Sequence, residues 1–329
     1  MTMSSITGQP GKGPAEIARP QRCAHLTADP RGYPIIATVG QPLGKVDFGT
    51  LSEQRKLALA TFDLCAVCAH PFGTELRWQV GFDGLLPDRF TEAPVHEICA
   101  LYAAQVCPFV SSPHARLGDD WRKGLRRPEL LTLTGFHRTK AVTGGRSGLQ
   151  RDSVLLFEMA GPTESHQIRT AEQAWQLYAE ALTTDTALAP VPAEQALIDV
   201  LCSPTAEENE DSGGVMAGAA WYCGAAFCPN VRKVQGMDRF IRPSSYDQIA
   251  ARLVLRPTAA ADLAESNDMA TRAAMNWLLT RTELPEVLSA WRRRGRRQLL
   301  DSAMHESTDE QRKKTKRKQQ ATGRRRNRR

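Results

Sequence analysis

Apolar and polar residues follow two different periods along the first half of the chain. In the segment Glu75–Phe82 every second residue is apolar: Leu76, Trp78, Val80 and Phe82. This alternation predicts a half-buried strand, and the turn signal Asp83-Gly84 after it predicts a hairpin that returns through residues 85–95. Short apolar stretches predict further strands at Pro34–Val39, Leu130–Leu133 and Val154–Phe157.

Apolar residues spaced three and four positions apart predict helices elsewhere. Two sequences have the form of a capping box, beginning at Thr50 and at Thr170, and each predicts the start of a helix. An apolar, alanine-rich stretch predicts a helix over residues 96–106 that Pro108 ends. A Pro- and Ala-containing connection follows at Thr183–Pro192. Beyond it the pattern is almost wholly helical, with candidate helices at Ala193–Cys202, Val215–Phe227, Ser245–Leu255, Thr258–Glu265, Met269–Arg281 and Pro285–Leu300.

These elements predict an α+β chain of four parts. We expect a disordered N-terminus at residues 1–21, an α+β domain with a small sheet at 22–187, an all-α C-terminal domain at 188–300 and a disordered basic tail at 301–329. The two ends are expected to be disordered because they contain too few apolar residues to pack.

The positive charge of the chain is concentrated at its C-terminal end. Residues 291–329 contain 16 Lys and Arg against 4 Asp and Glu, a net charge of +12, so the remaining residues carry −5 of the total of +7. A nucleic-acid contact, DNA or RNA without sequence preference, is therefore expected in the tail rather than on the body. The expected contact residues are Arg312, Lys313, Lys314, Lys316, Arg317, Lys318, Arg324, Arg325, Arg326, Arg328 and Arg329.

The sequence favours a cytoplasmic protein without a membrane partner. No apolar run approaches the roughly 18 residues that a membrane helix needs, and the N-terminal residues lack the apolar centre of a secretory signal. Thiols stay reduced in the cytoplasm. The eight cysteines are therefore better explained as metal ligands and small core residues than as disulfides.

Four residues have the spacing of a structural zinc site. Cys65-x2-Cys68 presents two sulfurs from one tight turn, and His96-x2-Cys99 presents two more ligands from one face of a helix start. The predicted hairpin lies between the two pairs. The order of these elements, first the Cys65-x2-Cys68 turn (a zinc knuckle), then a hairpin and then a helix that carries two ligands, predicts a treble-clef-like module. Because all four zinc ligands would come from the protein, the predicted site is closed and structural.

Several alternatives to this ligand set remain open at the level of the sequence. Cys107 lies eight residues beyond Cys99, roughly 12 Å along a helix, and could be a ligand only if the helix breaks early. His70 could replace His96 at a distorted site. The four residues could also sit in a core without metal, since free cysteine is often buried, or the Cys-x2-Cys pair could serve a redox reaction.

Two enzyme motifs fail at these positions. His96-Glu97-Ile-Cys99-Ala100 lacks the second histidine of a His-Glu-x-x-His metalloprotease, because position 100 is Ala. A zinc-knuckle nuclease of the His-Asn-His type needs a catalytic histidine in its hairpin, and residues 75–95 contain none.

A set of motifs in this part of the chain resembles a family of actinobacterial and actinophage proteins. The shared stretches are Arg22-Cys23-Ala-His25-Leu, Cys65-Ala-Val-Cys68 and the segment 93–109, which contains His96-x2-Cys99 and Cys107-Pro108. The resemblance covers roughly residues 22–185. It implies an origin and a zinc module. Since no activity is established for the family, it implies no catalytic residue, and it does not extend to residues 190–329.

The leading functional hypothesis is a non-enzymatic, zinc-containing protein that associates with nucleic acid through its basic tail. The first alternative is a protein–protein adaptor of phage, plasmid or actinobacterial origin, in which the tail has no nucleic-acid role. The second alternative is an enzyme of unknown chemistry whose site lies between the two domains. Arg292–Arg297 would suit a helix-turn-helix reader of DNA, but these arginines cluster at the end of the predicted helix rather than on one face.

Overall fold

The computed structural model describes most of the chain up to residue 202 and part of the chain beyond it. The described residues are 13–39, 51–82, 87–107, 130–146, 153–187, 189–202 and 264–290, with a few isolated positions and the short segment 313–317. The turn Asp83-Gly84, the predicted helix Ser245–Leu255 and nearly all of Val215–Phe227 and Thr258–Glu265 lie outside these residues.

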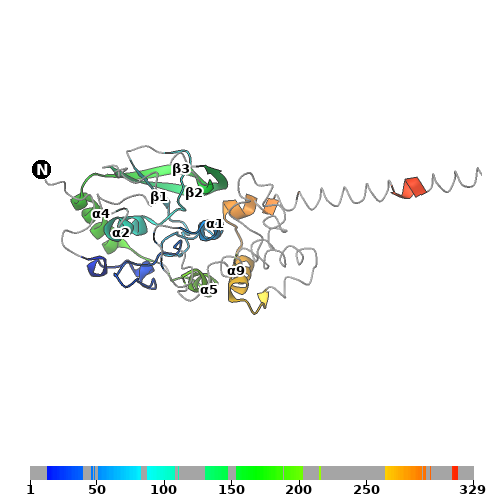
Figure 1. Ribbon diagram of the computed structural model, residues 1–329, viewed down its shortest axis with the longest axis horizontal. Coiled ribbons are helices and arrows are strands. Elements are labelled where there is room, and N and C mark those ends of the chain that lie inside the picture. Colours follow the sequence, from blue (N-terminus) through cyan, green and yellow to red (C-terminus); the bar gives the residue numbers. More distant parts are fainter. Residues whose placement is uncertain are drawn as a thin grey trace, which may run out of the picture.

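A three-stranded antiparallel sheet in the order β1-β2-β3 forms one layer of the fold (Figure 1). Its strands are β1 (Arg77–Phe82), β2 (Leu131–Arg146) and β3 (Ser153–Ile168). β1 confirms the alternating strand, and the apolar stretches at 130–133 and 154–157 fall near the starts of β2 and β3. Both of these strands run for 16 residues, far beyond the apolar stretches, because they pair with each other along their whole length.

The strand predicted at Pro34–Val39 is wrong. The segment makes only isolated bridges, between Ala28 and Pro34 and between Val39 and Leu51. The residues before it form a turn in which the Asp29 carboxylate accepts hydrogen bonds from the main-chain N–H groups of Arg31 and Tyr33. This local alternative to strand pairing is typical of aspartate.

The predicted helices of the described part are present. They are α1 (Glu53–Thr61), α2 (Glu97–Val106), α4 (Ala171–Thr184), α5 (Pro192–Cys202) and α9 (Met269–Thr280). Thr170 and Gln173 form the predicted reciprocal capping box of α4. The capping box predicted from Thr50 is wrong: Ser52 caps α1 by accepting a hydrogen bond from the N–H of Arg55.

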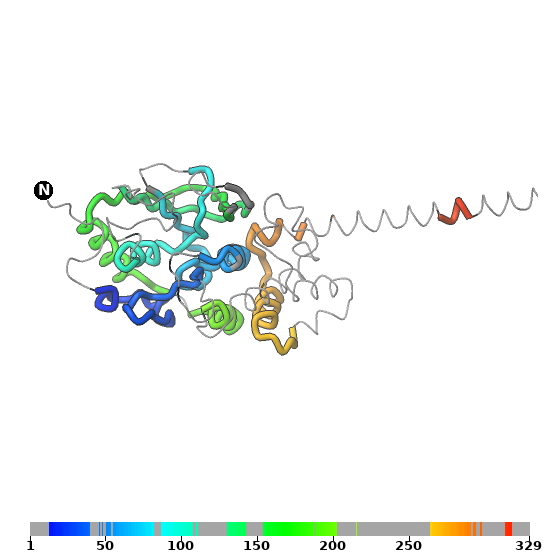
Figure 2. The backbone as a smooth tube through the Cα atoms, in the orientation of Figure 1, coloured from blue at the N-terminus to red at the C-terminus, as the bar shows by residue number. Residues whose placement is uncertain are grey.

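The structure describes the N-terminal segment from residue 13, so the disorder predicted for residues 1–21 is wrong for residues 13–21. It forms two short 3-10 helices, η1 (Pro14–Glu16) and η2 (Gln21–Cys23), and Figure 2 follows it (blue) beside α4. The side chain of Ile17 is buried in the core, and the hydroxyl of Tyr178 in α4 donates to the carbonyl of Ala18. Ile17 and Cys23 both belong to the apolar core, so this segment packs against the rest of the fold.

Helices α1, α2 and α4 lie on one side of the sheet (Figure 1) and contact its strands. The buried side chains of this layer and those of α5 and α9 belong to one apolar cluster. Phe62, which ends α1, meets the ring of Trp277 in α9 edge to face, with 5.1 Å between the ring centroids. Among the described helices, none combines the length and the apolarity that crossing a membrane requires.

The capping box of α4 provides a test of this part of the fold. We expect Thr170→Ala to lower the free energy of unfolding by about 1 kcal/mol, because it leaves the N–H of Gln173 without its side-chain acceptor. Thr183→Ala is the matched control, since the Thr183 hydroxyl bonds only the Glu180 carbonyl in the last turn of the same helix. Urea unfolding of both variants measures the difference. Equal stabilities of the two variants would contradict the assigned cap.

Candidate metal centre

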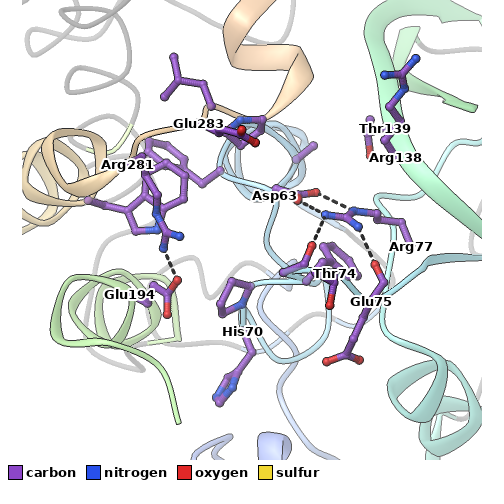
Figure 3. A pocket seen from close by; sticks show the side chains of 18 of the residues that line it. Asp63, His70, Thr74, Glu75, Arg77, Arg138, Thr139, Glu194, Arg281 and Glu283 are labelled. Atoms are coloured by element: carbon purple, nitrogen blue, oxygen red, sulfur yellow. Dashed lines mark hydrogen bonds and ion pairs between the residues drawn. The ribbon is translucent and has the colours of Figure 1, made fainter. Parts of the chain in front are cut away.

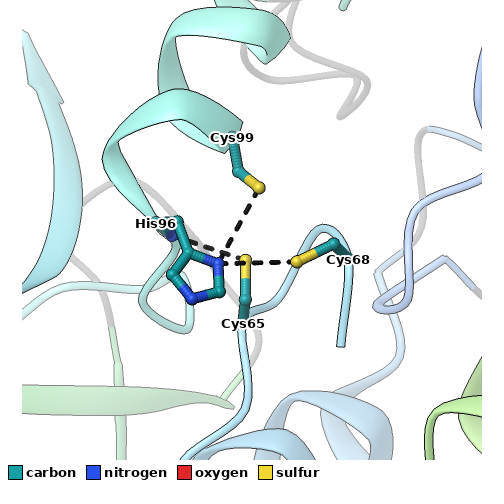
Figure 4. Close-up of side chains that lie close together, drawn as sticks. All are labelled: Cys65, Cys68, His96 and Cys99. Carbon is teal, nitrogen blue, oxygen red and sulfur yellow. Dashed lines mark hydrogen bonds between the residues drawn. The ribbon is translucent and has the colours of Figure 1, made fainter. Parts of the chain in front are cut away.

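The first pair of candidate ligands lies in a tight turn shortly after α1. The carbonyl of Cys65 accepts the N–H of Ala69 at 2.8 Å, and the N–H of Cys65 donates to the carbonyl of His70 at 2.9 Å. Ala69 has a φ of 57°, a left-handed conformation that costs a residue with a side chain roughly 1–2 kcal/mol. This turn presents the Sγ atoms of Cys65 and Cys68 to the start of α2 (Figure 4).

The second pair lies at the start of α2. The chain arrives there beside β1, since Trp78 and Val95 exchange two main-chain hydrogen bonds of 2.7 and 2.9 Å. His96 is the N-cap residue of α2 and Cys99 lies in its first turn, so the two side chains share one face of the helix. The N–H of His96 also lies 3.4 Å from Sγ of Cys65, which ties the start of the helix to the cysteine turn.

The four side chains converge on one point (Figure 4). One ligand atom from each of Cys65, Cys68, His96 and Cys99 lies within 4.8 Å of all the others. Nδ1 of His96 is 3.5 Å from Sγ of Cys68 and 3.9 Å from Sγ of Cys99. All four residues have an exposed fraction of 0%. The group is therefore close enough to hold a metal ion.

The imidazole of His96 is oriented for ligation through Nδ1. Its other nitrogen, Nε2, lies 3.3 Å from the carbonyl oxygen of Pro71. A carbonyl can only accept a hydrogen bond, so Nε2 carries a proton and Nδ1 is the nitrogen that faces the thiols and that can bind a metal once its own proton is lost. The ring of Phe72 packs against the imidazole, with 4.6 Å between centroids, and fixes its plane.

Charge in the metal-free cluster is shared between a thiolate and the imidazole. Burial alone lowers the pKa of His96, but the charges of Cys65 and Cys68 raise it to about 10. Burial raises the pKa of Cys68, whereas hydrogen bonds from Cys65 and Cys99 and the charge of His96 bring it down to about 6. Burial and the neighbouring thiols raise the pKa of Cys99 well above its ordinary value. Metal binding at this cluster therefore has to displace protons.

A fifth cysteine, Cys23, lies beside the cluster and escaped the sequence analysis as a site residue. Its Sγ is 3.8 Å from Sγ of Cys99, and it is completely buried. Hydrogen bonds with Cys68 and Cys99 lower the pKa of Cys23 to about 6. Cys23 stands 42 residues before Cys65 with no regular spacing to it, so only the motif Arg22-Cys23-Ala-His25 could have drawn attention to it.

The two alternative ligands considered from the sequence lie outside the group of four. α2 continues without a break to Val106, so Cys107 is its C-cap residue at the end opposite to Cys99. His70 is half-buried and stacks on His25, with 5.3 Å between the ring centroids. Neither Cys107 nor His70 belongs to the convergent group.

Only a small part of the predicted nucleic-acid contact lies among the described residues. Residues 313–317 form one helical turn with exposed side chains, where disorder was predicted; Lys and Arg are good helix formers. This turn contains four of the expected contact residues: Lys313, Lys314, Lys316 and Arg317. The other seven, Arg312, Lys318, Arg324, Arg325, Arg326, Arg328 and Arg329, lie outside the described residues.

Comparisons of the whole chain with protein-family models, with curated proteins and with solved structures gave no match. The site is therefore interpreted from its own geometry.

A second polar cluster supports the start of α2. Nε2 of His166 in β3 lies 2.7 Å from a carboxylate oxygen of Glu97, the first residue of α2. The indole of Trp78 stacks parallel to the His166 ring, with 5.0 Å between centroids. The hydrogen bond that His166 donates to the Glu97 carboxylate raises the pKa of His166 above its ordinary value of 6.5. When His166 is protonated, its ion pair with Glu97 therefore connects α2 to the sheet next to the candidate ligand His96.

This pair makes stability depend on pH in a defined direction. Because the folded state raises the pKa of His166, its contribution is fully present below the unfolded pKa and is lost as pH rises through the folded value. We expect Glu97→Gln to lower the pKa of His166, measured by titration of the histidine NMR signals. Glu164→Gln is the control, since Glu164 acts on His166 through charge alone and removing it lowers the pKa less. Equal effects would contradict the assigned hydrogen bond.

Proposed function

We propose that Cys65, Cys68, His96 and Cys99 hold one structural zinc ion. The observation that supports this most strongly is the convergence of three sulfurs and one imidazole nitrogen at a point that water does not reach. In a tetrahedral zinc site, Zn–S bonds of about 2.3 Å and Zn–N bonds of about 2.1 Å give a sulfur–nitrogen edge of roughly 3.6 Å. The two contacts to Nδ1 of His96, 3.5 and 3.9 Å, lie close to this length.

The elements around the site fit a treble clef. The cysteine turn supplies the first two ligands, β1 and the segment that ends at Val95 take the place of the hairpin, and α2 supplies the last two. With zinc bound, these four residues would fill all four positions of its tetrahedron, so none would remain for a substrate. When bound, zinc supplies folding free energy, of order 10 kcal/mol for small zinc modules.

We further propose that the chain is a non-enzymatic protein that associates with nucleic acid through its basic C-terminal tail. The support is the charge distribution: residues 291–329 carry +12, whereas the rest of the chain is slightly acidic. The four basic residues of the segment 313–317 have exposed side chains. Contacts between such a polycation and phosphates need no particular base sequence and weaken steeply with salt.

Metal content tests the zinc site. Elemental mass spectrometry of the purified, untagged protein should find one zinc per chain, and Cys99→Ser should remove it. Cys23→Ser is the matched control: Cys23 is equally buried and lies 3.8 Å from Cys99, yet it is outside the group of four, so this variant should keep its zinc. A zinc-free wild-type protein would refute the proposal, and loss of zinc in Cys23→Ser would refute the ligand set.

Cys68→Ala tests whether the zinc is structural. We expect this variant to release zinc and to lose the cooperative unfolding of the N-terminal part, because the binding free energy of a closed site is largely folding free energy. Thermal unfolding followed by circular dichroism measures the loss. A variant without zinc that unfolds at the wild-type temperature would contradict a structural role.

Deleting residues 312–329 tests the association with nucleic acid. The deletion should leave zinc content and unfolding temperature unchanged and remove most of the affinity for arbitrary duplex DNA or RNA, measured by fluorescence anisotropy at several salt concentrations. For the intact chain, the logarithm of the binding constant should fall linearly with the logarithm of the salt concentration. Unaltered affinity after the deletion would contradict this proposal while leaving the zinc site untouched.

A further inference from the structure

The thiol of Cys23 lies against the candidate metal centre but outside its ligand set. Sγ of Cys23 is 3.8 Å from Sγ of Cys99, yet Cys23 is not a member of the convergent group of four. Both cysteines are free and completely buried. A structural zinc site takes four protein ligands. With zinc bound to the group of four, Cys23 would therefore remain an unbound thiol beside a bound one.

A small movement is enough to join Cys23 and Cys99 in a disulfide. An S–S bond is about 2.05 Å long, so the two Sγ atoms have to approach each other by about 1.8 Å. Cys99 lies in the first turn of α2, a helix of ten residues, whereas Cys23 ends η2, a 3-10 helix of three residues. The hydrogen bonds of a 3-10 helix have poorer geometry than those of an α-helix. Cys23 is therefore the partner that moves.

Cys23 lies directly beneath the surface of the N-terminal segment. The two residues that follow it, Ala24 and His25, are exposed. Local opening of a short segment costs less free energy than unfolding of the core, so this segment can open while α2 and the sheet stay folded. A small oxidant can then reach the two thiols.

A disulfide between Cys23 and Cys99 is incompatible with metal binding by the group of four. The thiolate is the form of cysteine that binds a metal, and a sulfur atom in a disulfide is no longer a thiolate. The bond would leave Cys65, Cys68 and His96 as the remaining ligands of the group. A site with three protein ligands has an open position, so the closed structural site would be lost.

We propose that Cys23 and Cys99 form a redox switch that releases the metal when hydrogen peroxide oxidises them. This inference rests on the zinc site proposed above. In the first step the Cys99 thiolate attacks the peroxide: an S–O bond forms, the O–O bond breaks and hydroxide leaves, which gives a sulfenic acid. In the second step the Cys23 thiol attacks the same sulfur: the S–S bond forms, the S–O bond breaks, and the hydroxyl group leaves as water with the Cys23 proton. The two sulfurs together lose two electrons, which reduce the peroxide.

Cys23 is suited to the second step because it is not a ligand. A sulfenic acid condenses with a thiol that lies within reach. The sulfurs of Cys65 and Cys68 would be held by zinc, whereas Cys23 is free of the metal and lies 3.8 Å from Cys99. Reduction of the disulfide by a dithiol returns both thiols, so the ligand set is restored and the switch is reversible.

Peptide mapping of the full-length, zinc-loaded protein tests the switch. Trypsin cuts after Lys and Arg, so Cys23 falls in peptide 23–31, Cys65 and Cys68 in peptide 57–77, and Cys99 in peptide 90–116. Peptide 90–116 also contains Cys107, so the parent protein for the experiment is Cys107→Ser. We expect hydrogen peroxide to join peptide 23–31 to peptide 90–116 and, over the same time course, to release zinc to a chromogenic chelator. Dithiothreitol and added zinc should reverse both changes.

Two serine variants of this parent separate the switch from general oxidation. Cys23→Ser should contain zinc before treatment and lose it to peroxide more slowly than the parent, because the Cys99 sulfenic acid then has no free thiol beside it. Cys202→Ser is the matched control. Cys202 ends α5 and is also a free cysteine outside the group of four, so this variant should form the link and release zinc at the rate of the parent.

Three results would overturn the switch. The first is release of zinc without a link between peptides 23–31 and 90–116, or retention of zinc despite that link. The second is a link from peptide 23–31 to peptide 57–77 in its place, and the third is an equal rate of zinc release from Cys23→Ser and Cys202→Ser. Zinc is measured before peroxide is added: its absence at that point would refute the zinc site itself, whereas a zinc-loaded protein that forms no Cys23–Cys99 link would refute the switch alone.

Discussion

The structure depends on holding the Cys65–Cys68 turn against the first turn of α2, around ligand atoms that water does not reach. Three buried thiols and a buried imidazole would be costly to ionise without compensation. A bound cation would remove this cost, because it would take the lone pairs of the four atoms that the folded chain brings to one point. The backbone also contacts the candidate ligands. The N–H of His96 lies beside Sγ of Cys65, and the carbonyl of Pro71 faces Nε2 of His96.

The rest of the molecule is attached to this centre through short connections. α1 ends at Phe62, three residues before the first ligand, and the ring of Phe62 contacts Trp277 of α9. Asp63, the next residue, pairs with Arg77 at the base of β1. A cleft of about 530 Å³ between the two parts of the chain is bounded by these same residues (Figure 3). If the four residues bind zinc as proposed, loss of the zinc is expected to disturb this cleft, although the cleft lies outside the candidate metal centre.

The sequence predicted the convergence of Cys65, Cys68, His96 and Cys99 better than the fold around them, for a physical reason. Ligand spacing is local: two residues between ligands place them on one turn or one helix face, whatever surrounds them. Strand length, by contrast, depends on the partner strand. β2 and β3 reach 16 residues because they pair with each other along their whole length. Cys23 becomes a neighbour of Cys99 through tertiary packing alone, and no spacing in the sequence predicts it. The α+β class, by contrast, followed from periodicity within single segments.

X-ray absorption at the zinc edge tests the central claim most directly, because it counts the sulfur and nitrogen atoms bound to the metal in the intact protein. The account predicts three sulfurs at about 2.3 Å and one nitrogen at about 2.1 Å, with the nitrogen contribution lost in His96→Cys. A shell of four sulfurs in the wild-type protein would contradict it, since Cys23 would then have taken the place assigned to His96.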